Sequence, residues 1–487
     1  MKRLLEKNSL LFIVFLSLLL RLVWIDQGLW LDEAIGALEV KRHGFWGILT
    51  IFIRNDNHPP LYYLLLEAWT RIFGFSDFAI RSLSVILGVL NVLVLVKVAQ
   101  LVFPNKKGLQ KAVGLFLATS PFHIYYSQEA RMYIVAAFLT CLSIYSFLKL
   151  VKGQSLFDWI LFSFSITATV FTDYLPFFIL PALWLFALLR IRDSGWWRSF
   201  LLSHLPIFVL GLLWLPTFFI QLSSGGWLVS ILPAWAELAG GATLKNLLLV
   251  WMKFILGRIS LLPKYFYYAL IVLASLPFVF VFLQSLKKFK KFLIIFLWFF
   301  IPLFLGFVFS FIFPAFYYFR FLFIYPAFVL LLFVGLLGLT RNKKKILFSI
   351  LIFCNLVGFY FYVADENQRR EQWREATRFL EKSADEDAVV VFIYPEPFAA
   401  YRWYQRGIIK AYGVTDSISA NKDETLKITK KAISDKSKVY QFSYLEDLTD
   451  PQGLVRQTLR ESGFRITKTF SEFKGVGLIN LWEKEEF

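Results

Sequence analysis

Residues 292–309 read FLIIFLWFFIPLFLGFVF and contain no charged side chain. A run of this length approaches the roughly 20 apolar residues that a helix needs to cross the hydrocarbon core of a bilayer. A similar run, LLFIVFLSLLL, occupies residues 10–20 and follows a basic N-terminus. No small-residue cleavage site follows it in the sequence, so we expect a retained membrane anchor and not a signal peptide.

The composition of the whole chain agrees with a membrane protein. Hydrophobic residues make up 58% of the 487 residues, and the mean hydropathy is +0.60, whereas soluble domains usually contain roughly 45–50% apolar residues. The net charge is +18, but the basic residues cluster between apolar runs, which favours membrane lipids as partners and argues against nucleic acid. Cys141 and Cys354 both lie inside apolar runs, which argues against a disulfide framework or a cysteine-based zinc site.

The apolar runs predict an all-α polytopic membrane domain with about eleven transmembrane helices. Basic residues occupy every second connection between them, so we expect a cytoplasmic N-terminus and a location in the plasma membrane. The expected spans are residues 9–25, 77–103, 109–127, 131–150, 155–172, 174–191, 199–220, 264–284, 292–313, 321–339 and 346–363. The basic residues used are Lys2, Arg3, Lys7, Lys106, Lys107, Lys111, Lys149, Lys152, Arg190, Arg192, Arg198, Lys287, Lys288, Lys290, Lys291, Arg341, Lys343, Lys344 and Lys345.

One further apolar segment, residues 59–73, is short and contains Glu67 and Arg71. Counting it as a span would place Lys106 and its neighbours on the outer side and break the alternation of basic connections. We therefore expect an amphipathic juxtamembrane helix on the outer surface.

The chain changes character after residue 363, where charged and mixed sequence replaces the apolar runs. Residues 388–394, 438–444 and 476–482 read as strands, and residues 371–383 and 451–462 read as helices. We expect a transmembrane domain at residues 1–363 and a small extracytoplasmic α/β domain at residues 364–487.

The first outer loop, residues 26–76, holds the polar residues with the clearest functional interest. Asp32 and Glu33 begin the stretch DEAIGALEVKRHG, which reads as a helix capped by Asp32 and ended by Gly44. His58 stands before two prolines, which are ordinary at a helix start. From spacing alone, Asp32 could be only a cap and His58 only part of a structural turn.

Two other outer turns carry charge at the edge of the membrane. Glu129 and Arg131 lie in YYSQEARMY, residues 125–133, and Arg320 lies among aromatics in PAFYYFRFLFIYP, residues 314–326. Glu129 and Arg131 could form an interfacial ion pair, and Arg320 could snorkel in an aromatic belt. Because charge at this depth is costly, a functional role is the alternative, such as an arginine that binds a lipid phosphate.

These motifs together resemble the GT-C class of polyprenyl-phosphate-sugar-dependent glycosyltransferases. The bacterial branch akin to protein O-mannosyltransferases, lipid A aminoarabinose transferases and RgtA/B/C/D-like enzymes is the most similar. The segments that carry the resemblance are Trp30–Glu33, His58–Tyr63 and Tyr126–Tyr133, with a weaker match at Arg320–Pro326, where Phe321 replaces a usual tyrosine.

The resemblance implies sugar transfer, hexosyl or pentosyl, from a polyprenyl-phosphate-linked donor to a hydroxyl of a glycolipid, polysaccharide or protein. It implies Asp32 as the general base, with Glu33 as the active neighbour or a support, and inversion at the anomeric carbon. Donor contacts are expected from His58, Tyr62, Glu129, Arg131, Tyr133 and Arg320. A divalent metal on His58, Glu129 or Asp32 stays open, as does a lipid or saccharide transporter without glycosyl transfer.

Overall fold

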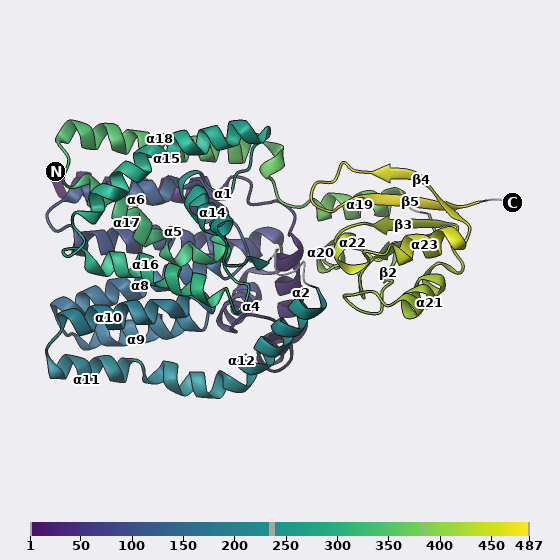
Figure 1. Ribbon diagram of the computed structural model, residues 1–487, viewed down its shortest axis with the longest axis horizontal. Coiled ribbons are helices and arrows are strands. Elements are labelled where there is room, and N and C mark those ends of the chain that lie inside the picture. The colour runs from purple at the N-terminus through teal and green to yellow at the C-terminus, as the bar shows by residue number, and fades with distance from the viewer. Residues whose placement is uncertain (1, 233–238, 384, 486–487) are drawn as a thin grey trace. The chain divides into compact units, whose positions relative to one another are not determined.

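The computed structural model describes residues 2–232, 239–383 and 385–485 (Figure 1). The chain forms two compact units. The first, the membrane unit, comprises residues 2–25, 43–226 and 239–368. The second, the tail unit, comprises residues 26–42, 227–232, 369–383 and 385–485, so it combines part of the first predicted outer loop with the C-terminal sequence.

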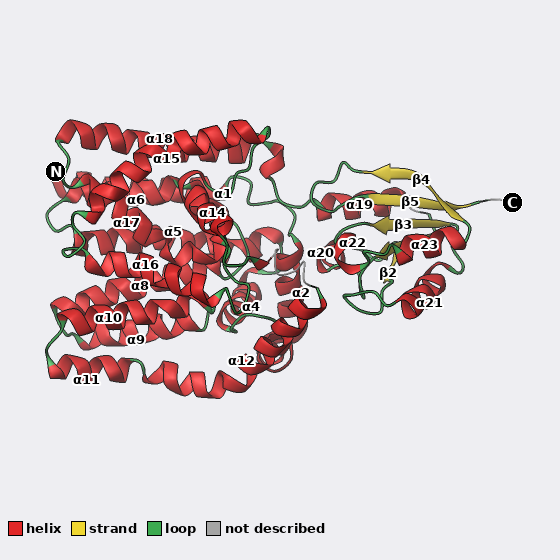
Figure 2. Ribbon diagram, viewed as in Figure 1, coloured by secondary structure: helices red, strands yellow, loops and turns green. Residues whose placement is uncertain are grey.

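Among the described residues, the regular secondary structure of the membrane unit is helical, and sheet occurs only in the tail unit (Figure 2). Its elements are α1 (Lys2–Leu22), η1 (Ile48–Phe52), α3 (Ile53–Asn55), α4 (Leu61–Phe73), α5 (Asp77–Val102), α6 (Lys107–Thr119), α7 (Pro121–Ser127), α8 (Tyr133–Lys152), α9 (Leu156–Val170), η2 (Leu175–Phe178), α10 (Ile179–Arg190), α11 (Ser194–Ser203), α12 (Leu205–Ile231), α14 (Leu244–Leu256), α15 (Lys264–Leu286), α16 (Leu293–Phe309), η3 (Tyr318–Ile324), α17 (Tyr325–Leu336), α18 (Arg341–Ala364) and η4 (Glu366–Gln368).

Six helical stretches among the described residues are long and apolar enough to cross a membrane, and four shorter apolar helices accompany them. The predicted span at residues 109–127 is not among these, because it is divided between α6 and α7. Ser120 caps α7 by accepting the His123 backbone N–H at 3.4 Å, and Pro121 occupies the first helical position. The total of eleven spans therefore stays a prediction.

Hydrogen bonds join parts of the chain that lie at or beside predicted basic connections. The Arg190 guanidinium donates to the Lys290 carbonyl at 2.5 Å, and the Lys152 amine donates to the Leu101 carbonyl at 2.9 Å. Both bonds link residues that are distant in sequence, so these parts of the chain lie beside one another in the structure. That these connections face the cytoplasm stays an expectation from the positive-inside rule.

The predicted juxtamembrane helix is present as α4, which begins after Pro60 and ends at Phe73. Tyr62 and Tyr63 lie on its buried face, whereas Ile72 and Phe73 are exposed. An amphipathic helix with exposed apolar residues suits the surface of a bilayer. Its position at the outer membrane surface remains a prediction.

The tail unit contains a five-stranded sheet of order β2-β1-β3-β5-β4. β1 pairs in parallel with β2 and β3, while β5 pairs antiparallel with β3 and β4. The three predicted strands are present, and β2 and β4 were not predicted. The elements are α19 (Trp373–Ser383), β1 (Ala388–Phe392), α20 (Ala399–Tyr404), β2 (Lys410–Gly413), α21 (Lys422–Ile433), β3 (Lys438–Phe442), α22 (Glu446–Thr449), α23 (Leu454–Glu461), β4 (Phe464–Phe470) and β5 (Ile479–Lys484).

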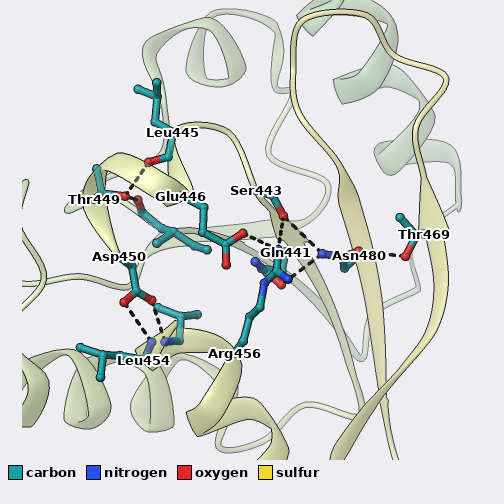
Figure 3. A network of polar contacts seen from close by, with 12 residues as sticks. Gln441, Ser443, Leu445, Glu446, Thr449, Asp450, Leu454, Arg456, Thr469 and Asn480 are labelled. Carbon is teal, nitrogen blue, oxygen red and sulfur yellow. Dashed lines mark hydrogen bonds and ion pairs between the residues drawn. The ribbon is translucent and has the colours of Figure 1, made fainter. Parts of the chain in front are cut away.

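Helices cover both faces of this sheet. On one face, Val389 and Val439 pack with Leu459 of α23. On the other, the Phe442 ring stacks on Trp373 of α19, with ring centroids 5.6 Å apart. A polar network joins β3, β4 and β5 to α22 and α23 (Figure 3) and uses Gln441, Ser443, Glu446, Asp450, Arg456, Thr469 and Asn480. Its hydrogen bonds link β5 to β3 and β4 and link the strand ends to α22 and α23, which fixes how these elements pack.

Residues 26–42 are attached to the tail unit by hydrogen bonds to distant residues. The Leu29 backbone N–H donates to the Tyr404 phenol oxygen at 2.6 Å, and the Arg374 guanidinium donates to the Asp26 carbonyl at 2.7 Å. Helix α2 (Leu31–Gly47) starts in this segment and is interrupted at Gly44, where φ is 60°. The predicted end of the helix at Gly44 is therefore confirmed.

Candidate functional site

The first turn of α2 carries both predicted catalytic carboxylates. The helix begins at Leu31, so Asp32 lies inside its first turn, and the prediction that Asp32 is the N-cap is wrong. Glu33, which is 1% exposed, accepts the Trp30 backbone N–H at 3.3 Å. In a capping box, a glutamate side chain accepts a backbone N–H at the start of its helix in this way, so Glu33 stabilises the start of α2.

A third carboxylate, Glu371, meets the same turn and was not predicted. Its Oε2 atom accepts the Leu31 backbone N–H at 3.3 Å and the Trp373 indole N–H at 2.6 Å. The Tyr444 hydroxyl donates to its Oε1 atom at 3.2 Å. Burial raises the pKa of Glu371 to about 7, and the negative charge of Asp32 adds to the rise.

The membrane unit holds a second polar cluster, formed by Asp56, His58, Tyr63 and Arg131. The Asp56 Oδ2 atom lies 3.2 Å from His58 Nδ1, and Arg131 donates to the Tyr63 phenol oxygen at 3.5 Å. Burial opposes ionisation of Asp56, but His58 and Arg131 outweigh it and lower the pKa of the carboxyl. Asp56 therefore remains an anion beside two buried basic residues.

The backbone of this cluster is held by Gln221 of α12. Its amide donates to the Ile53 carbonyl at 2.6 Å and to the His58 carbonyl at 3.1 Å. The Tyr174 hydroxyl donates in turn to the side-chain oxygen Oε1 of Gln221 at 2.5 Å. The π-helical turn η1 is separated from this loop only by the short helix α3, and such turns are frequent at functional sites.

A cationic cluster lies at the C-terminal end of α14 and was also missed by the sequence interpretation. The Arg258 guanidinium stacks on the Tyr125 ring at 4.8 Å from its centroid, and its charge interacts with Tyr318 and Glu129. The buried Lys253 amine donates to the Ile259 carbonyl at 2.6 Å. These are all residues of the membrane unit.

Lys253 lies outside the predicted spans, and its surroundings strongly lower its pKa. It is 6% exposed and donates a second hydrogen bond to the Tyr267 phenol oxygen at 3.1 Å. Burial lowers its pKa to about 7, and the neighbouring charges of Arg258 and Lys264 add to the lowering. An anion placed here would restore the charged form, so this cluster suits a phosphate group.

The remaining predicted residues border these clusters. Tyr133 begins α8 and packs on Phe319, with ring centroids 4.9 Å apart, next to Arg320 of η3. The Arg320 Nε atom is buried and has no hydrogen-bond partner among the described residues. Tyr62 packs on Tyr63, with ring centroids 5.3 Å apart.

The turn at residues 128–132 thus joins two groups of site residues. Arg131 contacts the first through Tyr63, and Glu129 interacts with the second through Arg258. Asp32 and Glu33 belong to the tail unit, whereas the other predicted site residues belong to the membrane unit. Among the described residues, no group of three His, Cys, Asp or Glu side chains has the arrangement of a metal site.

Comparison with known proteins gives this geometry a family context. The family of dolichyl-phosphate-mannose-protein mannosyltransferases matches residues 57–220, which include His58, Glu129 and Arg131. No curated protein sequence matches the chain.

Two solved structures share the fold over nearly the whole chain. ArnT from Cupriavidus metallidurans, bound to undecaprenyl phosphate, is 12% identical, with a TM-score of 0.55 over 98% of this chain and 97% of that chain. The oligosaccharyltransferase AglB from Archaeoglobus fulgidus, in complex with an inhibitory peptide and a dolichol-phosphate, is 12% identical, with a TM-score of 0.54 over 98% of this chain and 74% of that chain. The resemblance to GT-C enzymes is confirmed by the family match over residues 57–220 and by the shared fold.

Proposed function

We propose that this chain, a GT-C glycosyltransferase by family match and fold, transfers a sugar from a polyprenyl-phosphate-linked donor to a hydroxyl acceptor outside the cytoplasm. The observation that carries the proposal is the arrangement of buried charge around residues 128–132. Arg131 reaches Tyr63 beside Asp56 and His58, while Glu129 interacts with Arg258. Two basic groups are thus held next to acidic and phenolic groups that could orient a sugar.

Phosphate recognition is assigned to the cationic cluster of Lys253 and Arg258. The two structural relatives were solved with a polyprenyl phosphate, undecaprenyl phosphate in one and dolichol-phosphate in the other. Arg258 is exposed and offers a planar guanidinium, while Lys253 gains charge when an anion arrives. Arg131 and Arg320 remain the alternative phosphate ligands.

Asp32 is assigned as the general base. It would take the proton of the acceptor hydroxyl as the oxygen attacks the anomeric carbon, while the carbon–phosphate oxygen bond breaks. The phosphate leaves as an anion and needs positive charge but no proton, so a single base suffices. One displacement of this kind inverts the anomeric centre.

The choice of sugar, hexose or pentose, and of acceptor, whether glycolipid, polysaccharide or protein, is to be found by assay. The purified full chain is incubated with a panel of polyprenyl-phosphate sugars, and sugar transfer or slow release is measured. Asp32→Asn should reduce the rate about 10²–10⁴-fold, which is the usual contribution of a general base. Glu33→Gln should mainly lower thermal stability, because Glu33 closes the start of α2.

Loss of turnover in Glu33→Gln alone, with Asp32→Asn active, would move the base by one residue. Equal turnover in all three proteins would refute the mechanism. Transport of a polyprenyl-phosphate sugar across liposomes, without bond cleavage and without need for Asp32, would establish the transporter alternative.

A further inference from the structure

Glu371 is the residue of the tail unit that contacts the turn carrying Asp32. It is separated by 340 positions from Leu31, whose backbone N–H it accepts at 3.3 Å. The first N–H groups of a helix have no partner within the helix, so an acceptor from elsewhere fixes where the helix starts. The Glu371 carboxylate does this for the residue directly before Asp32.

The carboxylate of Glu371 is itself held on several sides. The Trp373 indole and the Tyr444 hydroxyl donate to it, at 2.6 Å and 3.2 Å. Burial raises the pKa of Tyr444, so its hydroxyl stays a donor at physiological pH. Gly475 lies against the Glu371 side chain, where a Cβ atom would come within 2.7 Å of Glu371 Cγ.

Burial and four neighbouring groups act on the ionisation of the Glu371 carboxyl. The neighbours are Trp373, Tyr444, the Leu31 N–H and Asp32. Nearby in the tail unit, the Arg374 guanidinium donates to the Asp26 carbonyl at 2.7 Å, and the Lys474 amine donates to the Arg369 carbonyl at 2.5 Å.

We propose that Glu371 is a positioning residue for the transfer reaction, which fixes the first turn of α2 that carries Asp32. The inference rests on the proposed role of Asp32. Its physical basis is that an ionised carboxylate accepts hydrogen bonds more strongly than a protonated one, so Glu371 holds the Leu31 N–H most firmly when it is charged. A first turn that is held in one position keeps the proposed base in the geometry that the transfer needs.

The test separates charge from position with four variants of the full chain. Glu371→Gln keeps the length and one acceptor oxygen but removes the charge. Glu371→Asp keeps the charge but withdraws it by about 1.5 Å, one carbon–carbon bond. Tyr404→Phe removes the 2.6 Å hydrogen bond from the Leu29 backbone N–H and so loosens the same segment. It does not alter the charge. Glu396→Gln is the matched control, since it removes one exposed carboxylate of the tail unit that pairs with Arg402.

The readouts are kcat and KM for the donor between pH 5 and 9, and amide hydrogen exchange in the peptide that contains Leu31. The wild-type kcat should rise with an inflection near pH 7, as Glu371 ionises. Glu371→Gln should lose this inflection, lower kcat by about tenfold above pH 7 with KM unchanged, and speed exchange at Leu31. Glu371→Asp should keep an inflection at reduced kcat, while Tyr404→Phe and Glu396→Gln should keep it at the wild-type pH.

An unchanged kcat and an unchanged inflection in Glu371→Gln would overturn the inference. If Glu371→Gln does not fold, Glu371→Asp decides, and wild-type kcat in that variant overturns it equally. The two levels of the proposal fail differently. Full activity in Asp32→Asn refutes the proposed base, whereas inactivity of Asp32→Asn together with a wild-type Glu371→Gln refutes only the role of Glu371.

Discussion

The pKa of the Lys253 amine lies close to neutral pH, so its titration can be used to test the proposed phosphate site. Burial first, and then the charges of Arg258 and Lys264, lower its pKa to about 7. The lysine is therefore close to half charged at neutral pH in the protein without ligand. If it contacts the donor phosphate, affinity for the donor must fall as pH rises through 7.

The size of the effect follows from that pKa. With a pKa of about 7, roughly nine tenths of the amines are charged at pH 6 and about one tenth at pH 8. If only the charged form binds, the dissociation constant should rise about tenfold between these values. The phosphodiester of a polyprenyl-phosphate sugar keeps one negative charge over this range, so the ligand does not contribute to the change.

The assay is calorimetric titration of a short-chain, water-soluble polyprenyl-phosphate sugar into the purified protein at pH 6, 7 and 8. Lys253→Arg should flatten the pH dependence, because a guanidinium stays charged throughout. Lys253→Met should weaken binding at pH 6 and also remove the pH dependence. Lys290→Met removes one charge from a basic connection, at a distance in sequence from the site, and should retain the wild-type slope.

A tenfold slope that persists in Lys253→Arg would show that another group titrates. A wild-type dissociation constant that does not change between pH 6 and 8 would remove Lys253 from the site. The unliganded protein supplies an independent check. The Lys253 amine holds its proton up to about pH 10.5 in the unfolded chain but only to about pH 7 in the folded chain. The free energy of unfolding should therefore rise with pH between about 7 and 10.5. This rise should be smaller in Lys253→Met.

Two further changes probe the membrane unit. Asp56→Asn should lower the free energy of unfolding by about 1.5–3 kcal/mol, the worth of a hydrogen bond to a charged group, because it removes the anion that holds His58; thermal unfolding in detergent measures this. The pKa of Asp56 lies below its usual value, so its contribution to stability is present above pH 3.8 and disappears as pH falls through the lowered pKa, and Asp56→Asn should lack that acid-induced loss. Gly335→Ala should destabilise the bundle by about 1–3 kcal/mol, because the new Cβ would lie 1.9 Å from the Val281 carbonyl oxygen, and a thermal midpoint equal to wild type would contradict this packing. Gly338→Ala is the matched control, since its nearest neighbour is the mobile end of a lysine.

Most of the membrane unit could be predicted because long apolar runs have few alternatives to a helix in a bilayer. The strands at β1 and β3 were equally clear, since a run such as AVVVF fits only the interior of a sheet. β2 and β4 were missed for a physical reason. Both lie at sheet edges, and β4 exposes every residue between Phe464 and Phe470, so neither shows a buried apolar pattern.

The candidate site residues also divide into those that the sequence indicates and those that it does not. His58, Glu129 and Arg131 could be proposed as candidates because they stand in short polar motifs beside apolar runs. Glu371 and Lys253 could not, since each lies in sequence with no distinctive motif and gains its unusual chemistry from burial. For Glu371, the residues responsible include Leu31, hundreds of positions away. Local sequence carries no signal of such a contact.

The inclusion of residues 26–42 in the tail unit has a practical consequence for cutting the protein into fragments. A fragment that starts near residue 364 would omit the segment that supplies the donor to Tyr404 and one donor to Glu371. It would present an open docking face and would be expected to capture a synthetic peptide of residues 26–42 in trans. The tail unit is thus built from separate segments of the sequence. Insertion of a tag or protease site at Gly44 would divide α2 and leave its N-terminal part attached to the tail unit.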